Sequence, residues 1–131
     1  MDREWILLNP GPANTTASVR GALVMPDLCH RVARYAENAR TLRDGMTRLG
    51  LEILTPAGAR SNILTTFRLP AGVSYPALHD AMKRRGYIIY AGQGEIAKYG
   101  FRVANMGTLT PADMRGVVAA FAASLEEPRD R

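Results

Sequence analysis

One arginine in this 131-residue sequence lies where a side chain could bind an anion. Arg102 interrupts the apolar run from Phe101 to Ala104, which is typical of a strand. A guanidinium in apolar surroundings is costly unless it meets an anion, and its planar fork can hold a carboxylate through two hydrogen bonds. Three interpretations stay open: Arg102 points outward from a half-exposed strand, pairs with a structural carboxylate such as Asp113, or binds the carboxylate of a ligand.

Other residues with chemical potential lack the spacing that a site requires. Gly92-Gln93-Gly94 matches neither a phosphate-binding loop nor a dinucleotide fingerprint, and is predicted to be a connector. His30 and His79 are far apart, and no Cys or His pair has metal-ligand spacing. Cys29 has no obvious base beside it to make it a nucleophile. We therefore expect no metal site.

The charge balance is strongly basic and depends almost entirely on arginine. The net charge is +5, and only Lys83 and Lys98 are lysines. Arginine suits carboxylate and phosphonate groups, and a basic chain can also bind nucleic acid. The sequence lacks the aromatic motif of RNA-binding sheets, which argues against nucleic acid. An arginine-rich composition also follows simply from a GC-rich genome.

Length and composition indicate one compact domain in a reducing compartment. A hydrophobic content of 47% is ordinary for a globular protein. No apolar run approaches the roughly 20 residues of a membrane span. Cys29 is the single cysteine and cannot form an internal disulfide, so we expect a cytoplasmic protein with no membrane partner.

Periodicity and capping signals predict the elements that would position Arg102. An extended segment at Trp5–Leu8 and a helix from Thr15 or Thr16 to Met25 come first. Apolar spacing then predicts three helices and four strands. These are a helix from about 32 to Leu49, strands 51–54 and 62–67, a helix 75–85 capped by Ser74, strands 87–90 and 101–104, and a helix capped by Thr110 and running to about Leu125. The order indicates an α+β fold: a small, mostly antiparallel sheet covered by helices.

Several motifs together resemble one enzyme family. They are Leu7-Leu8-Asn9-Pro10-Gly11-Pro12 followed by Thr15-Thr16, Met25 to Arg31, Arg60 to Pro70, Gly86 to Gly92, and Phe101-Arg102-Val103-Ala104-Asn105-Met106-Gly107. The combination is similar to class V pyridoxal-phosphate aminotransferases, and most of all to 2-aminoethylphosphonate–pyruvate transaminases. Ala104 departs from the pattern, because glycine is more usual there.

The resemblance implies a function and a set of site residues. Such enzymes use pyridoxal phosphate to move an amino group from a small amine to a 2-oxo acid. By this resemblance Arg102 grips the substrate carboxylate, while Gly11, Pro12 and Asn14 belong to a loop that lines the substrate pocket. The fold implied is the small domain of a fold-type I aminotransferase, preceded by an N-terminal arm.

The same resemblance implies a cofactor domain between the N-terminal motifs, which end at Arg31, and the later motifs. In this sequence Arg31 is followed directly by Val32 and the predicted small-domain helix. Neither lysine has the context of the Schiff-base lysine that pyridoxal phosphate needs. We therefore expect an arm at 1–31, a small domain at 32–131, no catalysis by the chain alone, and self-association through an uncovered apolar face. Two alternatives stay open: a small anion- or nucleic-acid-binding module, and a subunit that completes an active site with a separate cofactor-domain chain.

Overall fold

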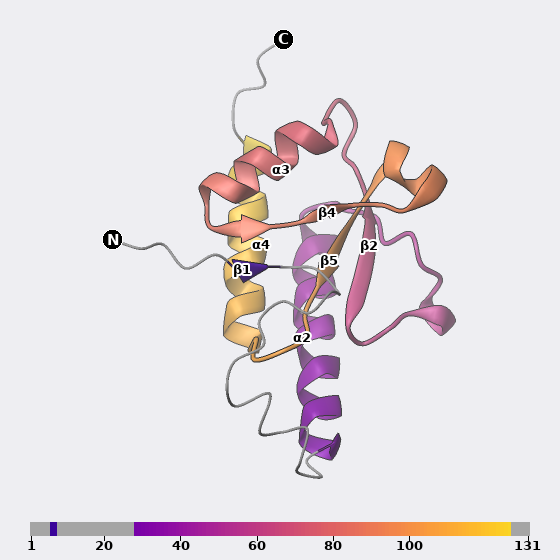
Figure 1. Cartoon of the computed structure of the whole chain (residues 1–131), viewed down its shortest axis with the longest axis vertical. Coiled ribbons are helices and arrows are strands. Elements are labelled where there is room, and N and C mark those ends of the chain that lie inside the picture. Colours follow the sequence, from indigo (N-terminus) through magenta and orange to yellow (C-terminus); the bar gives the residue numbers. More distant parts are fainter. Residues whose placement is uncertain (1–5, 8–27, 127–131) are drawn as a thin grey trace.

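A computed structural model describes residues 6–7 and 28–126, with side chains from His30 onward (Figure 1). The chain begins with a short strand and a long helix, and strands then alternate with helices and 3₁₀ turns. They are β1 (Ile6–Leu7), α2 (Leu28–Arg48), the 3₁₀ turn η1 (Ala57–Ala59), β2 (Leu64–Arg68), α3 (Tyr75–Arg84), β3 (Tyr87–Ile88), β4 (Tyr90–Ala91), the 3₁₀ turn η2 (Gly94–Lys98), β5 (Gly100–Ala104) and α4 (Pro111–Glu126).

The central sheet has three antiparallel strands in the order β2-β5-β4. β1 pairs in parallel with β3, with Ile6 opposite Tyr87 and Leu7 opposite Ile88. The long helices α2 and α4 run side by side next to the sheet (Figure 1). The predicted α+β fold with a small antiparallel sheet is therefore confirmed.

The core lies between β5, β2 and the helices. Phe67 and Phe101 stack with ring centroids 5.6 Å apart, and Phe101 stacks on Phe121 of α4 at 5.3 Å. All three rings are fully buried. Because Phe101 and Val103 point to the helices, the period of two in a strand turns Arg102 to the opposite face of the sheet.

Local capping signals were read correctly from the sequence. The Ser74 side chain accepts a hydrogen bond from the Ala77 amide at the start of α3. Thr110 and Asp113 form a reciprocal capping box, in which Asp113 Oδ2 accepts from the Thr110 amide at 2.7 Å. Gly86 ends the α3 segment with a φ of 92°, a conformation that favours glycine.

Three predicted elements differ from the structure. α2 begins at Leu28 rather than near residue 32, so residues 28–31 already belong to the helix. The strand predicted at 51–54 is a single bridge between Ile53 and Phe67. The strand predicted at 87–90 is split into β3 and β4, because Ile89 between them turns fully into the core. The division at residue 31 stays a prediction, as does the helix predicted near 15–25, which lies outside the described residues.

The two long helices approach most closely at a glycine. A Cβ built on Gly45 of α2 would lie 2.5 and 2.9 Å from the two Cγ atoms of Val118 on α4. Those distances are too short for real side chains, so glycine is needed for this helix contact. Beside it, a groove of about 300 Å³ is lined by Thr41, Asp44, Gly45, Arg48, Arg115 and Val118.

Candidate functional site: an arginine on the open face of the sheet

Arg102 occupies the central strand β5 and is half-buried. Its Nε donates a hydrogen bond of 2.8 Å to the backbone oxygen of Ala91 on β4. This bond uses one edge of the guanidinium and leaves the edge formed by Nη1 and Nη2 available. Within residues 28–126 no hydrogen bond or ion pair engages those two terminal nitrogens. The arginine is therefore held in place with its free edge able to accept an anion.

Asp113, the carboxylate suggested as a structural partner of Arg102, is bonded to another residue. Asp113 Oδ2 accepts from both the amide and the hydroxyl of Thr110, each at 2.7 Å. Asp113 is thus committed to the N-terminus of α4, where a carboxylate is favoured by the helix dipole. The interpretation of Arg102 as a partner of Asp113 is wrong.

The chain directly after Arg102 is fastened to α2. The Arg34 guanidinium donates to the Gly107 oxygen at 2.9 Å, and the Gly107 amide donates to the Tyr35 hydroxyl at 3.1 Å. Asn38 Nδ2 donates to the backbone oxygens of Asn105 at 3.2 Å and Leu109 at 2.8 Å. These four bonds fix the turn at Gly107, whose φ of 84° favours glycine.

Asn105 completes this polar network from the other side. Its Nδ2 donates to the backbone oxygens of Tyr35 at 3.1 Å and Asn62 at 2.8 Å. Asn38 and Asn105 are both fully buried, and the Oδ1 atom of each has no partner among the described residues. The helical periodicity over residues 32–49 predicts Asn38 on the polar face and Val32 on the apolar face, and the prediction for Asn38 is wrong because a single buried amide gives no periodic signal. The exposed Val32, expected on the apolar face, is the converse error.

A tyrosine on α3 reaches the same edge of the sheet. The Tyr75 hydroxyl donates to the Ile89 backbone oxygen at 3.0 Å. Burial raises the pKa of Tyr75; a backbone hydrogen bond from Ala91 and the charge of Arg102 act in the opposite direction, while Tyr90 also raises it. Tyr90 and Arg102 therefore both lie near the Tyr75 hydroxyl.

The glycine-rich loop after β4 packs closely at Gly92. A Cβ on Gly92 would lie 2.6 to 2.7 Å from atoms of Ile96, so this glycine is required by the turn at η2. No group of three or more metal-ligating side chains occurs within the described part of the chain. Within the same residues, no helix has the length and apolarity to cross a bilayer. The predicted pocket residues Gly11, Pro12 and Asn14 lie outside the described residues.

Comparison with known sequences gives a clear relationship. Over 98 residues the chain is 43% identical to 2-aminoethylphosphonate–pyruvate transaminases of Burkholderia mallei and Burkholderia pseudomallei. The corresponding protein of Burkholderia thailandensis is 41% identical over 97 residues. Over this aligned region, the chain belongs to the aminotransferase family. The alignment spans 73% of this chain and only 26% of the Burkholderia mallei relative, so the chain spans about a quarter of the length of these relatives. No protein-family profile matches it.

Solved aminotransferase structures share the fold. Aspartate aminotransferase from Thermus thermophilus matches with a TM-score of 0.64 at 31% identity, over 72% of this chain and 26% of that one. Pyridoxamine–pyruvate aminotransferase from Mesorhizobium loti gives 0.66 at 30%, over 71% and 24%. Ureidoglycine–glyoxylate aminotransferase from Bacillus subtilis gives 0.73 at 23%, over 82% and 28%, which shows the fold alone.

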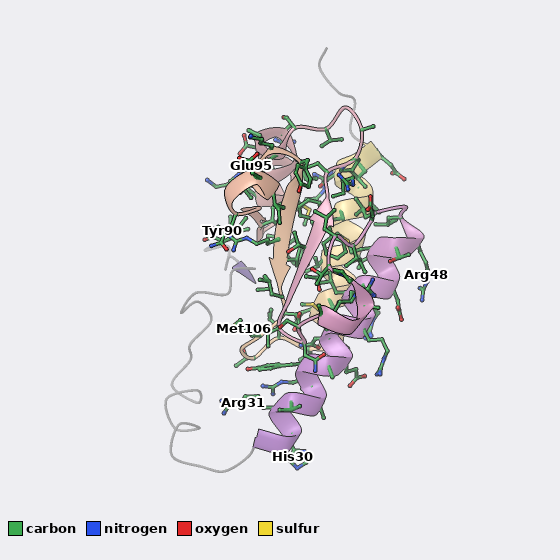
Figure 2. All side chains as sticks on the ribbon, turned by 90° about the vertical axis from the view of Figure 1, so that its right-hand side faces the viewer. His30, Arg31, Arg48, Tyr90, Glu95 and Met106 are labelled. Atoms are coloured by element: carbon green, nitrogen blue, oxygen red, sulfur yellow. The ribbon has the colours of Figure 1, made fainter. Side chains whose placement is uncertain are left out.

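The aminotransferase family uses pyridoxal phosphate, but the lysines of this chain do not fit that group. Lys98 Nζ pairs with Glu95 Oε2 at 2.5 Å, and its side chain is 70% exposed. Lys83 is exposed in the last turn of α3. A Schiff-base lysine has to lie in a protected pocket with an acid near the pyridine nitrogen. Figure 2 shows Glu95 at the far end of the sheet from Met106, the residue that follows the anchored Asn105.

Proposed function

We propose that this chain forms the substrate-anion side of an aminotransferase active site of the 2-aminoethylphosphonate–pyruvate kind. The observation that carries the proposal is Arg102, which is held by Ala91 on a central strand with its terminal nitrogens free. The named relatives, at 43% identity, support the choice of substrate class. In this role Arg102 binds the carboxylate of the 2-oxo acid, and Gly11, Pro12 and Asn14 line the pocket.

We further propose that the chain does not catalyse amino transfer alone. Its two lysines are exposed, and neither has the surroundings of a Schiff-base residue. The cofactor lysine and the acid at the pyridine nitrogen would then come from a separate cofactor-binding chain. Arg102 supports this arrangement of two chains. Its Nε is fixed by the Ala91 oxygen while its terminal nitrogens are free for a ligand, and such a ligand would be enclosed only when the cofactor-binding chain is present.

Anion binding by Arg102 can be tested by NMR titration with propionate, a simple carboxylate. We expect the Arg102 Nε–H resonance to shift in the wild type, and the Arg102→Gln variant to lose propionate binding. Arg40→Gln is the matched control, because Arg40 is exposed on α2. A wild type that shows no shift, or an Arg102→Gln variant that binds propionate unchanged, would refute the role of Arg102.

The cofactor proposal has its own test. Mixing the chain with pyridoxal phosphate should give no absorbance band that survives dialysis, because exposed lysines form only transient adducts. Lys83→Arg and Lys98→Arg variants identify the origin of any band that does persist. A stable band lost in one of these variants, together with transamination of 2-aminoethylphosphonate, would show that the chain is a complete enzyme.

Self-association is a further part of the proposal. Val32 and Ile63 are large apolar side chains with exposed fractions of 57% and 37%, and both are available to a partner surface. We expect dimers or larger species in sedimentation experiments. A single monomeric species at micromolar concentration would contradict this expectation.

A further inference from the structure

The sheet places two hydroxyl side chains beside Arg102. In the strand register, Arg102 of β5 lies opposite Thr66 of β2 and opposite Tyr90 of β4. Directly opposed residues of antiparallel strands point to the same face, with their Cβ atoms about 4.5–5.5 Å apart. Thr66, Arg102 and Tyr90 therefore form one row across the face of the sheet that is turned away from Phe101. Figure 2 shows Tyr90 on the side of the sheet opposite α2.

Arg102 leans toward Tyr90 rather than toward Thr66. Its Nε bonds to the oxygen of Ala91, the residue that follows Tyr90 in β4. The guanidinium therefore lies over β4. A tyrosine hydroxyl stands about as far from the backbone as a guanidinium, whereas a threonine hydroxyl stays near the strand. Of the two neighbours, Tyr90 is thus the one whose hydroxyl can reach an anion bound on the outer edge of Arg102.

The polar groups of Tyr90 and Arg102 are available for a ligand. Both residues are half-buried, and within residues 28–126 no hydrogen bond engages the Tyr90 hydroxyl or the terminal nitrogens of Arg102. The neighbouring Tyr75 hydroxyl is different, because it is already bonded to the Ile89 oxygen. The electrostatic influence of Tyr90 and Arg102 on Tyr75 supports their closeness.

We propose that Tyr90 is a second anion-binding residue that distinguishes a phosphonate from a carboxylate. The Nη1 and Nη2 atoms of Arg102 donate to two oxygens of either group. A carboxylate has no further oxygen, whereas a tetrahedral phosphonate has a third, which accepts a hydrogen bond from the Tyr90 hydroxyl. The inference rests on the proposed function of Arg102 and adds to it the recognition of the amino donor's phosphonate by the same row of residues.

The test compares ethylphosphonate with propionate, which share an ethyl group and differ in the head group. We expect Tyr90→Phe to weaken ethylphosphonate binding about tenfold, the low end for a hydrogen bond to a charged group at a half-exposed site. Propionate binding should change less than about twofold, because its two oxygens need only Arg102. Tyr99→Phe, at an exposed tyrosine near the end of the same sheet, is the matched control and should change neither.

A second measurement needs no variant. In the wild type, the ring resonances of Tyr90 should shift on adding ethylphosphonate and stay in place on adding propionate. If Tyr90→Phe leaves ethylphosphonate binding unchanged or weakens both ligands equally, the inference is wrong, while propionate binding that depends on Arg102 would still support the proposed function. If the wild type does not bind propionate at all, the proposed function itself is refuted.

Discussion

Replacing Asn38 by aspartate changes two hydrogen bonds into two repulsions with almost no change of shape. The Asn38 amide nitrogen donates to the backbone oxygens of Asn105 and Leu109, at 3.2 and 2.8 Å, from a fully buried position. An ionised aspartate has no donor, so it would place a negative charge against two carbonyl oxygens. The nearby Arg34 guanidinium is engaged by the Gly107 oxygen at the exposed surface and gives little compensation.

The magnitude follows from two contributions. Two lost hydrogen bonds cost about 1 kcal/mol each, and a buried unpaired charge adds several more. We therefore expect the Asn38→Asp variant to lose about 3–5 kcal/mol of unfolding free energy at neutral pH. A domain of this size has only about 5–10 kcal/mol in total, so the variant should be close to unfolding.

The loss should depend on pH with a definite sign. Burial raises the pKa of the new carboxyl in the folded state above the ordinary value of about 3.9. Between those two values the folded state binds more protons than the unfolded state, so stability falls as pH rises. A protonated carboxyl can again donate one hydrogen bond. The deficit relative to wild type should therefore shrink to about 2 kcal/mol or less as the pH is lowered to about 4.5.

Urea denaturation followed by circular dichroism, at about pH 7.5 and about pH 4.5, measures both quantities. Asn62→Asp is the matched control, because the Asn62 side chain is exposed although its backbone oxygen belongs to the same network. That control should stay within about 0.5 kcal/mol of wild type. A deficit below about 1 kcal/mol for Asn38→Asp at neutral pH, or one that does not change with pH, would refute the described role of Asn38.

Three further predictions concern the scaffold and its ionisable groups. Gly45→Ala should destabilise the fold by about 1–2 kcal/mol, since overpacking against Val118 exceeds the gain in helix propensity; Val118→Ala in the same chain should restore most of the loss, and a stabilised single variant would contradict the described helix contact. The hydrogen bond from Arg68 holds the pKa of Glu52 below its ordinary value. The stabilising effect of this pair is therefore present above the ordinary glutamate pKa and is lost as pH falls through the lowered pKa of Glu52. Carboxyl NMR titration of Arg68→Gln should show the Glu52 pKa at its ordinary value. Burial raises the pKa of Tyr75, so its contribution to stability is lost as pH rises from the ordinary tyrosine pKa through the raised one. Ultraviolet titration of the wild type and of Tyr75→Phe should show that the variant lacks one phenol transition lying above the ordinary tyrosine pKa.

Features that depend on near neighbours in sequence could be predicted. The alternation of Phe101 and Val103 around Arg102 made an outward-facing arginine one of three open interpretations, and the structure has Arg102 half-buried between two buried neighbours. Ser74 and Thr110 were found as helix caps because a cap needs only its own residue and the next three or four. Such signals survive folding because little outside the element can override them.

Features that depend on distant backbone atoms could not be predicted. The acceptor that fixes Arg102 is the Ala91 carbonyl, and its position depends on Ile89 turning into the core between two short strands. Asn38 bonds to backbone oxygens 67 and 71 residues further along the chain. A polar residue on a helix reads as solvent-facing unless the loop that covers it is known, so the polar network beside the candidate site carried no signal in the sequence.

The strand order has a consequence for how the chain is made. β5 lies between β2 and β4 in the sheet, yet it is the last of the three in sequence (Figure 1). During synthesis β2 and β4 therefore emerge before the strand that joins them, and each presents unpaired backbone groups until that strand arrives. The strand that carries Arg102 is thus also the one whose arrival closes the sheet, and until it arrives β2 and β4 lack their shared partner.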